Sequence, residues 1–242
     1  DRPKIISDVF HGYAEPLVGP LLLSATTTTP LPTSTTTIAE IMKKAGWQKN
    51  ATTSAWELPA KKKGDESLAL AFTLSTSDAP ELKRVAELVK HDWEAVGVKV
   101  DLKIFEQGAL TESVIRPREY EALLYGEVIG RNWDLYPFWH STQRLDPGLN
   151  IALYTNVTVD KILDQIRVAS TTGERLIGHL ALDKEIRQDE PAVFLYAPRF
   201  LYVIPDQVEA IDLGTINTPS ERFLGIYNWH IKTDRVWPIF IN

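Results

Sequence analysis

The stretches Leu68-Ala-Leu-Ala-Phe-Thr-Leu74 and Val98-Lys-Val-Asp-Leu-Lys-Ile104 decide the fold of this chain. In each of them every second side chain is apolar, which is the period of a β-strand with one buried face. Between them, apolar residues recur at helical spacing, namely Leu82, Val85, Ala86, Val89, Trp93 and Val96. This order of strand, helix and strand predicts a βαβ unit with parallel strands and a right-handed crossover.

Both ends of the central helix carry boundary signals. Asp78-Ala-Pro-Glu81 matches a capping box, in which the acid three residues on reaches back to the first amides of the helix. Gly97 follows the last apolar position, and glycine commonly ends helices because it accepts a left-handed backbone. The sequence therefore predicts a helix between these two signals.

Weaker patterns extend this unit in both directions. Before it we expect a short helix over residues 3–10, a threonine-rich extended connector over 24–37 and a helix over 38–45 that Thr37 caps. A strand over 56–58 and a polar turn over 61–65 then lead into the unit. After it we expect a helix over residues 109–115 and a strand over 119–127. Two helices over 159–166 and 174–188 follow, and then two short strands over 192–196 and 200–204. The aromatic tail over residues 221–237 has no clear period and receives no assignment.

The composition excludes several function classes. The chain has 242 residues, 24% of them charged, and a net charge of −6, so it has no basic stripe for nucleic acid. No apolar run approaches the roughly 20 residues of a membrane-spanning helix, and we expect a peripheral association with membranes at most. Cysteine is absent, which removes disulfides and thiolate sites. Because the chain begins at Asp1, we expect a mature product or an excised fragment.

The sequence contains no recognisable catalytic or metal-binding motif. Its five histidines, at positions 11, 91, 140, 179 and 230, never have the spacing of a helix-borne zinc site. Nucleophile elbows and phosphate loops are absent. The acids over residues 183–190 alternate with Lys184 and Arg187, as on a solvated helix face. We therefore expect no metal, no cofactor and no catalytic residue.

The segment Arg131-Asn-Trp-Asp-Leu-Tyr-Pro-Phe-Trp-His-Ser141 is the candidate ligand-facing segment. It follows a predicted strand directly, and ligands of open α/β sheets bind outside the carboxyl ends of strands. Its rings suit the walls of a pocket, and its polar groups suit the orientation of a ligand. The alternative is a loop whose aromatic rings cover the edge of the core.

Two ionisable residues of this segment have competing interpretations. Asp134 lies in an apolar neighbourhood and needs a cationic partner, which is either Arg131 or a ligand amine. His140 either donates a hydrogen bond to a ligand or stabilises a turn. A hydrolase with Asp134 and His140 as acid and base is the weakest alternative, because only their proximity supports it.

Several further stretches follow one another in a family-specific order. They are Arg2, His11–Pro20, Ala45–Trp47, Leu70–Leu74, Gly97–Leu102, Arg118–Ala122, Asp134–Ser141, Tyr154–Asn156 with Val159-Asp160, and Asp189–Tyr196. Together they resemble the C-terminal lobe of the bacterial extracellular solute-binding proteins of family 5, the oligopeptide, dipeptide and nickel type that serves ABC importers. The resemblance covers nearly the whole chain.

The resemblance implies an α/β fold, namely a periplasmic-binding-protein-like class II lobe with a mixed sheet flanked by helices. We expect a helix and Thr/Pro-rich connector over residues 1–37, where the Thr-rich stretch replaces a family loop commonly rich in Pro and Tyr. The resemblance implies the solute-binding lobe over 38–204 and a return segment over 205–242 that would cross to a missing N-terminal lobe. It further implies an extracytoplasmic monomer, periplasmic or membrane-anchored outside the cell. Such a protein binds a peptide or similar small solute without catalysis and meets an ABC transporter permease.

The resemblance also implies which residues face the ligand. They are Glu127, Arg131, Asn132, Trp133, Asp134, Tyr136 and His140. In the family, the acid at the position of Asp134 pairs with the α-amino group of a peptide. Gly126-Glu127 replaces the usual Gly-Trp and Asp134-Leu135 the usual Asp-Pro, which leaves room for a solute other than an ordinary peptide. The remaining alternative is a sensor or protein-interaction module built on the same lobe.

Overall fold

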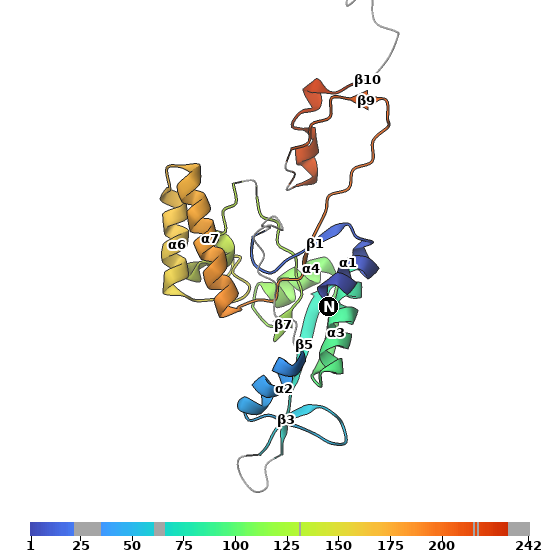
Figure 1. The fold of residues 1–242 in the computed structure, drawn as a ribbon, viewed down its shortest axis with the longest axis vertical. Coiled ribbons are helices and arrows are strands. Elements are labelled where there is room, and N and C mark those ends of the chain that lie inside the picture. Colours follow the sequence, from blue (N-terminus) through green and yellow to red (C-terminus); the bar gives the residue numbers. More distant parts are fainter. Residues whose placement is uncertain (22–34, 61–65, 131, 215, 217, 232–242) are drawn as a thin grey trace, which may run out of the picture. The chain divides into compact units, whose positions relative to one another are not determined.

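The computed structural model describes residues 1–21, 35–60, 66–130, 132–214, 216 and 218–231 (Figure 1). The chain forms two compact units. The larger unit contains Asp1–Gly126 and Leu135–Pro198, and the smaller contains Glu127–Asp134 and Arg199–Asn242. Residues 24–34 of the connector predicted over 24–37, and the predicted turn over 61–65, lie outside the described residues, and the last three connector residues form the start of a helix.

The predicted helices of the larger unit lie close to their expected positions, and two short helices, α5 (Tyr136–Trp139) and the 3-10 helix η2 (Ser141–Gln143), form in addition within the candidate segment and at its end. The others are α1 (Arg2–Phe10), α2 (Thr35–Lys44), α3 (Pro80–Ala95), α4 (Gln107–Leu110), the π-helix η1 (Thr111–Ile115), α6 (Val157–Val168) and α7 (Thr172–Asp189). Helix α2 begins two residues before Thr37, its predicted cap, a difference within the usual uncertainty of helix ends. The π-helix continues α4 without a break.

A parallel sheet in the order β6-β5-β7 forms the centre of the larger unit. Its strands are β5 (Ala71–Ser77), β6 (Lys99–Phe105) and β7 (Ala122–Leu123). β5 pairs with β6 over its whole length, and helix α3 connects the two, so the predicted parallel βαβ unit is confirmed. Its core consists of Leu74, Ala86, Val98 and Val100, each 6% exposed or less. Burying such a side chain stabilises the fold by about 1.5–3 kcal/mol.

The predicted capping box before α3 is wrong. The helix begins at Pro80, so its N-cap is Ala79, which has no side-chain oxygen to accept a hydrogen bond. The amide of Asp78 instead donates to the carbonyl of Phe105 at the end of β6. A reciprocal capping box does form at α7, between Thr171 and Glu174, where no proline shifts the helix start.

The predicted strand over residues 119–127 is much shorter in the structure. Only Ala122 and Leu123 pair with β5, and the amide of Leu124 adds one bond to the carbonyl of Ser75. The chain then leaves the larger unit after Gly126, which ends the pairing. The sheet edge here is covered by a second core cluster of Leu110, Val114 and Ile115.

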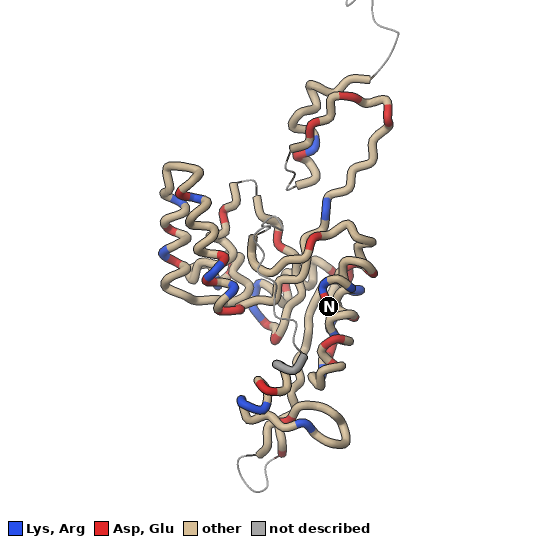
Figure 2. The backbone as a smooth tube through the Cα atoms, in the orientation of Figure 1, with Lys and Arg blue, Asp and Glu red and all other residues tan. Residues whose placement is uncertain are grey.

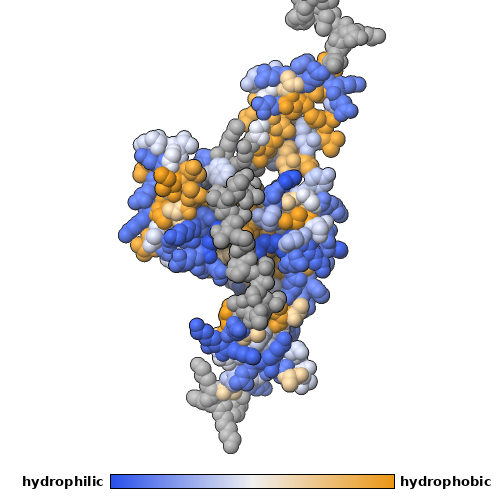
Figure 3. All heavy atoms as spheres, in the orientation of Figure 1, coloured by the Kyte–Doolittle hydropathy of each residue, from blue (hydrophilic) through white to orange (hydrophobic). Residues whose placement is uncertain are grey.

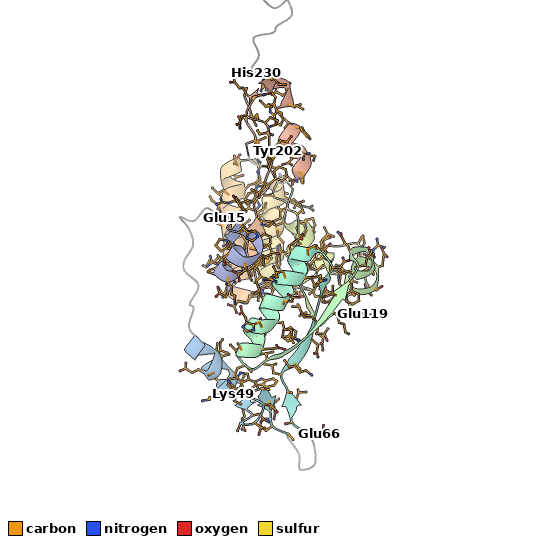
Figure 4. The ribbon with its side chains drawn as sticks, turned by 90° about the vertical axis from the view of Figure 1, so that its right-hand side faces the viewer. Glu15, Lys49, Glu66, Glu119, Tyr202 and His230 are labelled. Carbon is orange, nitrogen blue, oxygen red and sulfur yellow. The ribbon has the colours of Figure 1, made fainter. Side chains whose placement is uncertain are left out.

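Antiparallel pairing occurs in separate, smaller sheets. Strands β2 (Gln48–Lys49), β3 (Trp56–Leu58) and β4 (Leu68–Ala69) form one of them, around Lys49 and next to Glu66 (Figure 4). Strands β1 (Ala14–Pro16) and β8 (Tyr196–Pro198) form another. The predicted strands over residues 192–196 and 200–204 are therefore wrong except at Tyr196. The rings of Phe200 and Tyr202 pack with other aromatic side chains instead of joining a sheet.

Helices α6 and α7 pack against each other at unusually close range. A Cβ atom on Gly178 of α7 would lie 2.5 Å from Cγ1 of Ile166 on α6, so this position has room only for glycine. Val159, Leu163, Leu182 and Ile186 are at most 1% exposed between the helices. Acidic and basic residues recur along both helices (Figure 2), as expected for helices that have a solvated face.

The smaller unit contains little regular structure in its described residues. Strands β9 (Val208–Glu209) and β10 (His230–Ile231) pair antiparallel, and two 3-10 helices precede β10, η3 (Pro219–Phe223) and η4 (Ile226–Asn228). Tyr202 and His230 belong to this unit (Figure 4). Its apolar contacts are mainly between aromatic rings, namely those of Phe200, Tyr202, Phe223 and Trp229.

Candidate functional site

The one-turn helix α5 is anchored in the core of the larger unit by two side chains. Leu135, just before it, is 1% exposed, and Trp139, its last residue, is 5% exposed. The Trp139 ring contacts Tyr154 edge-on, with centroids 6.3 Å apart, and Phe194 at 5.8 Å. Leu135 and Trp139 therefore hold α5 against the core.

His140 follows α5 and is buried. Its Nδ1 accepts the amide hydrogen of Thr142 at 3.2 Å, so a neutral ring carries its proton on Nε2. Nε2 lies 3.8 Å from Oδ1 of Asp160 and 3.9 Å from Oδ1 of Asp164. The ring thus supports the turn after α5, which is the second of the two interpretations offered by the sequence.

Two polar side chains fix the backbone of this turn. Asn150, fully buried, donates through Nδ2 to the carbonyls of His140 and Tyr154 at 3.1 and 3.0 Å, and accepts from the Tyr154 amide at 3.1 Å. The Asp160 carboxylate accepts from the amide and the hydroxyl of Ser141 at 2.8 and 2.6 Å. The backbone from His140 to Ser141 is therefore held rigidly against α6.

The loop of the smaller unit contains the first half of the candidate segment. Trp133 has φ +53°, a left-handed conformation that is strained for a bulky side chain, and its amide donates to the carbonyl of Gly130 at 2.9 Å. Trp133 and Asp134 are half-buried and Asn132 is exposed. Strained backbone of this kind is concentrated at ligand-binding and active sites.

Glu127 lies at the beginning of the same loop. Desolvation by the surrounding protein raises the pKa of Glu127 to about 7, although its surface remains open to water. Its position at the surface keeps the carboxyl group hydrated, and hydration stabilises the charged form. Glu127 is therefore accessible to a solute.

The seven predicted site residues are distributed over both units. Tyr136 and His140 belong to the larger unit, and their rings lie stacked 4.1 Å apart. Glu127, Asn132, Trp133 and Asp134 belong to the loop of the smaller unit, and Arg131 lies outside the described residues. Asp134 and His140 thus belong to different units.

The sequence did not identify three α6 residues as neighbours of the candidate segment, namely Asp160, Asp164 and Arg167. They contact His140, Ser141 and Tyr136. Their spacing of four and three residues places them on one helix face, and this polar stripe is the signal that would have identified them.

Within the described ranges, no group of three or more histidine, aspartate or glutamate side chains is arranged to hold a metal ion. None of the helices in the described parts of the chain combines the length and the apolarity that crossing a membrane requires.

A family model described as bacterial extracellular solute-binding proteins, family 5, matches residues 1–156. The oligopeptide-binding protein AppA of Bacillus subtilis is 24% identical over 192 residues, which cover 78% of this chain and 33% of that protein. The glutathione-binding protein GsiB of Escherichia coli is 24% identical over 215 residues, or 83% of this chain and 38% of that protein.

Solved structures share the fold. AppA in complex with a nonapeptide gives a TM-score of 0.72 at 23% identity, covering 96% of this chain and 45% of AppA. NikZ from Campylobacter jejuni in complex with Ni(L-His) gives 0.73 at 18% identity, covering 95% of this chain and 46% of NikZ. The chain thus has the predicted α/β fold of a periplasmic-binding-protein-like lobe, and it spans between a third and a half of the length of these relatives.

Proposed function

Because the chain belongs to the bacterial extracellular solute-binding proteins of family 5, we propose that it forms one side of a solute-binding cleft in the binding protein of an ABC importer. The observation that carries the proposal is the family match over residues 1–156, since it includes the whole candidate segment. The protein would act outside the cytoplasm, in the periplasm or anchored to the membrane, and would deliver its solute to a permease.

The proposed solute is a peptide or a similar small molecule. AppA was solved with a nonapeptide and NikZ with Ni(L-His), so the fold accepts both extended and compact solutes. The proposed contacts are those of Glu127, Arg131, Asn132, Trp133, Asp134, Tyr136 and His140. Trp133 and Asp134 lead this set, because the strained backbone at Trp133 presents a large ring and a carboxylate side by side in one loop.

Asp134 is proposed to recognise a solute amine. A half-buried carboxylate is stabilised by a cation, and a hydrogen bond between charged groups contributes about 1.5–3 kcal/mol. His140 contributes less directly, because its Nδ1 already accepts the hydrogen bond from Thr142. A hydrolase that uses Asp134 with His140 is not supported by these roles, and the protein is proposed to leave its solute intact.

Asp134→Asn is expected to abolish the preference of the chain for a free amino terminus. Wild-type protein should bind tetra-alanine about tenfold more tightly than N-acetyl tetra-alanine, since acetylation removes the cation. Saturation-transfer NMR titration measures both affinities, and mass spectrometry of the recovered peptide checks that it is not cleaved. Asp206→Asn, which changes an exposed acid of the same unit, should keep the preference.

Affinity for both peptides is expected to be weak, with Kd on the order of 1 mM, because one side of a cleft buries only part of a ligand. Equal affinity of the wild-type chain for the two peptides would rule out amine recognition. Nanomolar affinity would show that this chain binds without a second lobe.

Residues 205–242 are proposed to pack against a second lobe of the full-length protein. The described part of this segment exposes Leu224 by 56%, Tyr227 by 82% and Ile231 by 61%, and apolar side chains are visible on the surface of the smaller unit in Figure 3. Patches of this kind mark interfaces. The competing function, an interaction module that self-associates, is favoured by the same exposure.

Sedimentation velocity over a hundredfold range of concentration separates these functions. We expect a monomer at every concentration, because the patch matches a different lobe and not a second copy of this chain. A reversible dimer that Tyr227→Ser dissociates would instead support the interaction module. Val168→Ser, which changes an exposed apolar residue of the larger unit, serves as the control.

A further inference from the structure

The ring of Tyr136 lies between two planar groups. The imidazole of His140 is stacked on it, with centroids 4.1 Å apart and planes inclined by 19°. The guanidinium carbon of Arg167 lies 3.9 Å from the centroid of the same ring. Two groups so close to one ring centre cannot share a face, so His140 and Arg167 cover opposite faces of Tyr136.

Each outer layer of this stack is fixed by its own surroundings. The His140 ring is buried, and its Nδ1 accepts the Thr142 amide while its Nε2 faces Asp160 and Asp164. Arg167 lies in the last turn of α6, where the helix dipole favours a cation. Helix α6 is in turn held by its buried apolar face.

We propose that Arg167 is a positioning residue for the candidate ligand-facing segment and that it acts through the ring of Tyr136. Tyr136 is the first residue of α5, so holding the ring fixes the start of this helix and with it the part of the segment that lies in the larger unit. Neither the composition of the segment nor its resemblance to a family singled out Arg167. The inference deepens the proposed function, on which only its ligand-binding consequence depends.

The contact between Arg167 and the Tyr136 ring has a small interaction energy, which suits a positioning role. A guanidinium over an aromatic face at an exposed site contributes enough to change a local equilibrium a few fold, but too little to decide the folding of the unit. Removal of Arg167 should therefore loosen α5 without melting its surroundings. Trp139 and Leu135 would keep the helix attached to the core while the ring of Tyr136 gained freedom.

Amide hydrogen exchange of the 242-residue chain tests this without a ligand. Arg167→Met keeps the apolar stem and removes the guanidinium, so exchange of the Phe138, Trp139 and His140 amides, which close α5, should become about threefold faster. Exchange in β5 and β6 and the unfolding temperature should not change. Arg175→Met, at an exposed arginine of α7, is the matched control and should match the wild type.

A double-mutant cycle tests whether Arg167 acts through the ring. In a Tyr136→Leu background, the further change Arg167→Met should leave exchange of the α5 amides unaltered, because the ring that it holds is gone. Equal effects of Arg167→Met with and without the ring would overturn the proposal. So would wild-type exchange of the α5 amides in Arg167→Met.

The ligand-binding consequence is measured with tetra-alanine. Arg167→Met should weaken its binding about threefold at an unchanged unfolding temperature, whereas a residue with a purely structural role would change both together. Faster exchange at α5 with unaltered tetra-alanine affinity would overturn positioning of the solute site. If the wild-type chain binds no peptide, the proposed function fails, and the exchange cycle alone decides whether Arg167 positions the segment.

Discussion

Replacing Asn150 by alanine is expected to lower the free energy of unfolding of the larger unit by about 3 kcal/mol. The side chain is fully buried and makes three hydrogen bonds, to the carbonyls of His140 and Tyr154 and from the amide of Tyr154. The change leaves all three backbone groups without this partner in a dry environment and opens a cavity. Urea unfolding followed by circular dichroism measures the loss.

Asn228→Ala is the matched control, because Asn228 is exposed in the smaller unit, and it should change the stability by less than about 0.5 kcal/mol. The carbonyl of His140 belongs to the turn that closes α5, so Asn150→Ala should also speed amide exchange there more than in β5. A stability loss below about 1 kcal/mol would mean that water replaces the amide and that Asn150 does not organise the turn.

Gly97→Ala is expected to cost a similar amount, about 3 kcal/mol, by a different mechanism. Gly97 joins α3 to β6 with φ +98°, where an L side chain is strained. A Cβ atom there would also lie 2.6 Å from the carbonyl oxygen of Ser54, so the loop before β3 must move. The buried Trp56, whose Nε1 donates to the carbonyl of Val96 at 2.8 Å, would move with it.

Gly173→Ala provides the control for this substitution. A Cβ atom on Gly173 has no neighbour within 4 Å, and the residue lies in the first turn of α7. Alanine at this position should leave the stability unchanged or raise it by about 0.5 kcal/mol, since it reduces the conformational entropy of the unfolded chain. Thermal unfolding of the two variants side by side checks the contrast. Equal unfolding temperatures would show that the Ser54 loop yields to the added methyl group.

Predictions from sequence succeeded where a local period decided the structure. The alternation in β6 and the helical stripe of α3 each require only neighbouring residues, and both elements formed as predicted. Predictions failed where the partner is distant. Phe200 and Tyr202 have the composition of a strand, yet no other strand meets them in the described residues, and their rings pack with Phe223 and Trp229.

The candidate site divides in the same way. Its loop was visible from composition, because two tryptophans, one acid and one histidine lie within eleven residues. The partners of that loop were not visible, because Asp160 and Arg167 are about twenty to thirty positions further along the chain and meet α5 only after α6 folds back. The left-handed backbone at Trp133 has no signal in the residue type.

The sequence by itself thus determined the βαβ unit, the end of its helix at Gly97 and the identity of the aromatic segment, since periodicity and backbone preference act between near neighbours. Only the tertiary structure decided how deeply each residue of that segment is buried. Trp139 is buried and Trp133 is half-buried on a strained turn, although both are tryptophans in one short run. Trp139 is buried because Tyr154 and Phe194 pack against its ring, and no local pattern records contacts between residues so far apart in the chain.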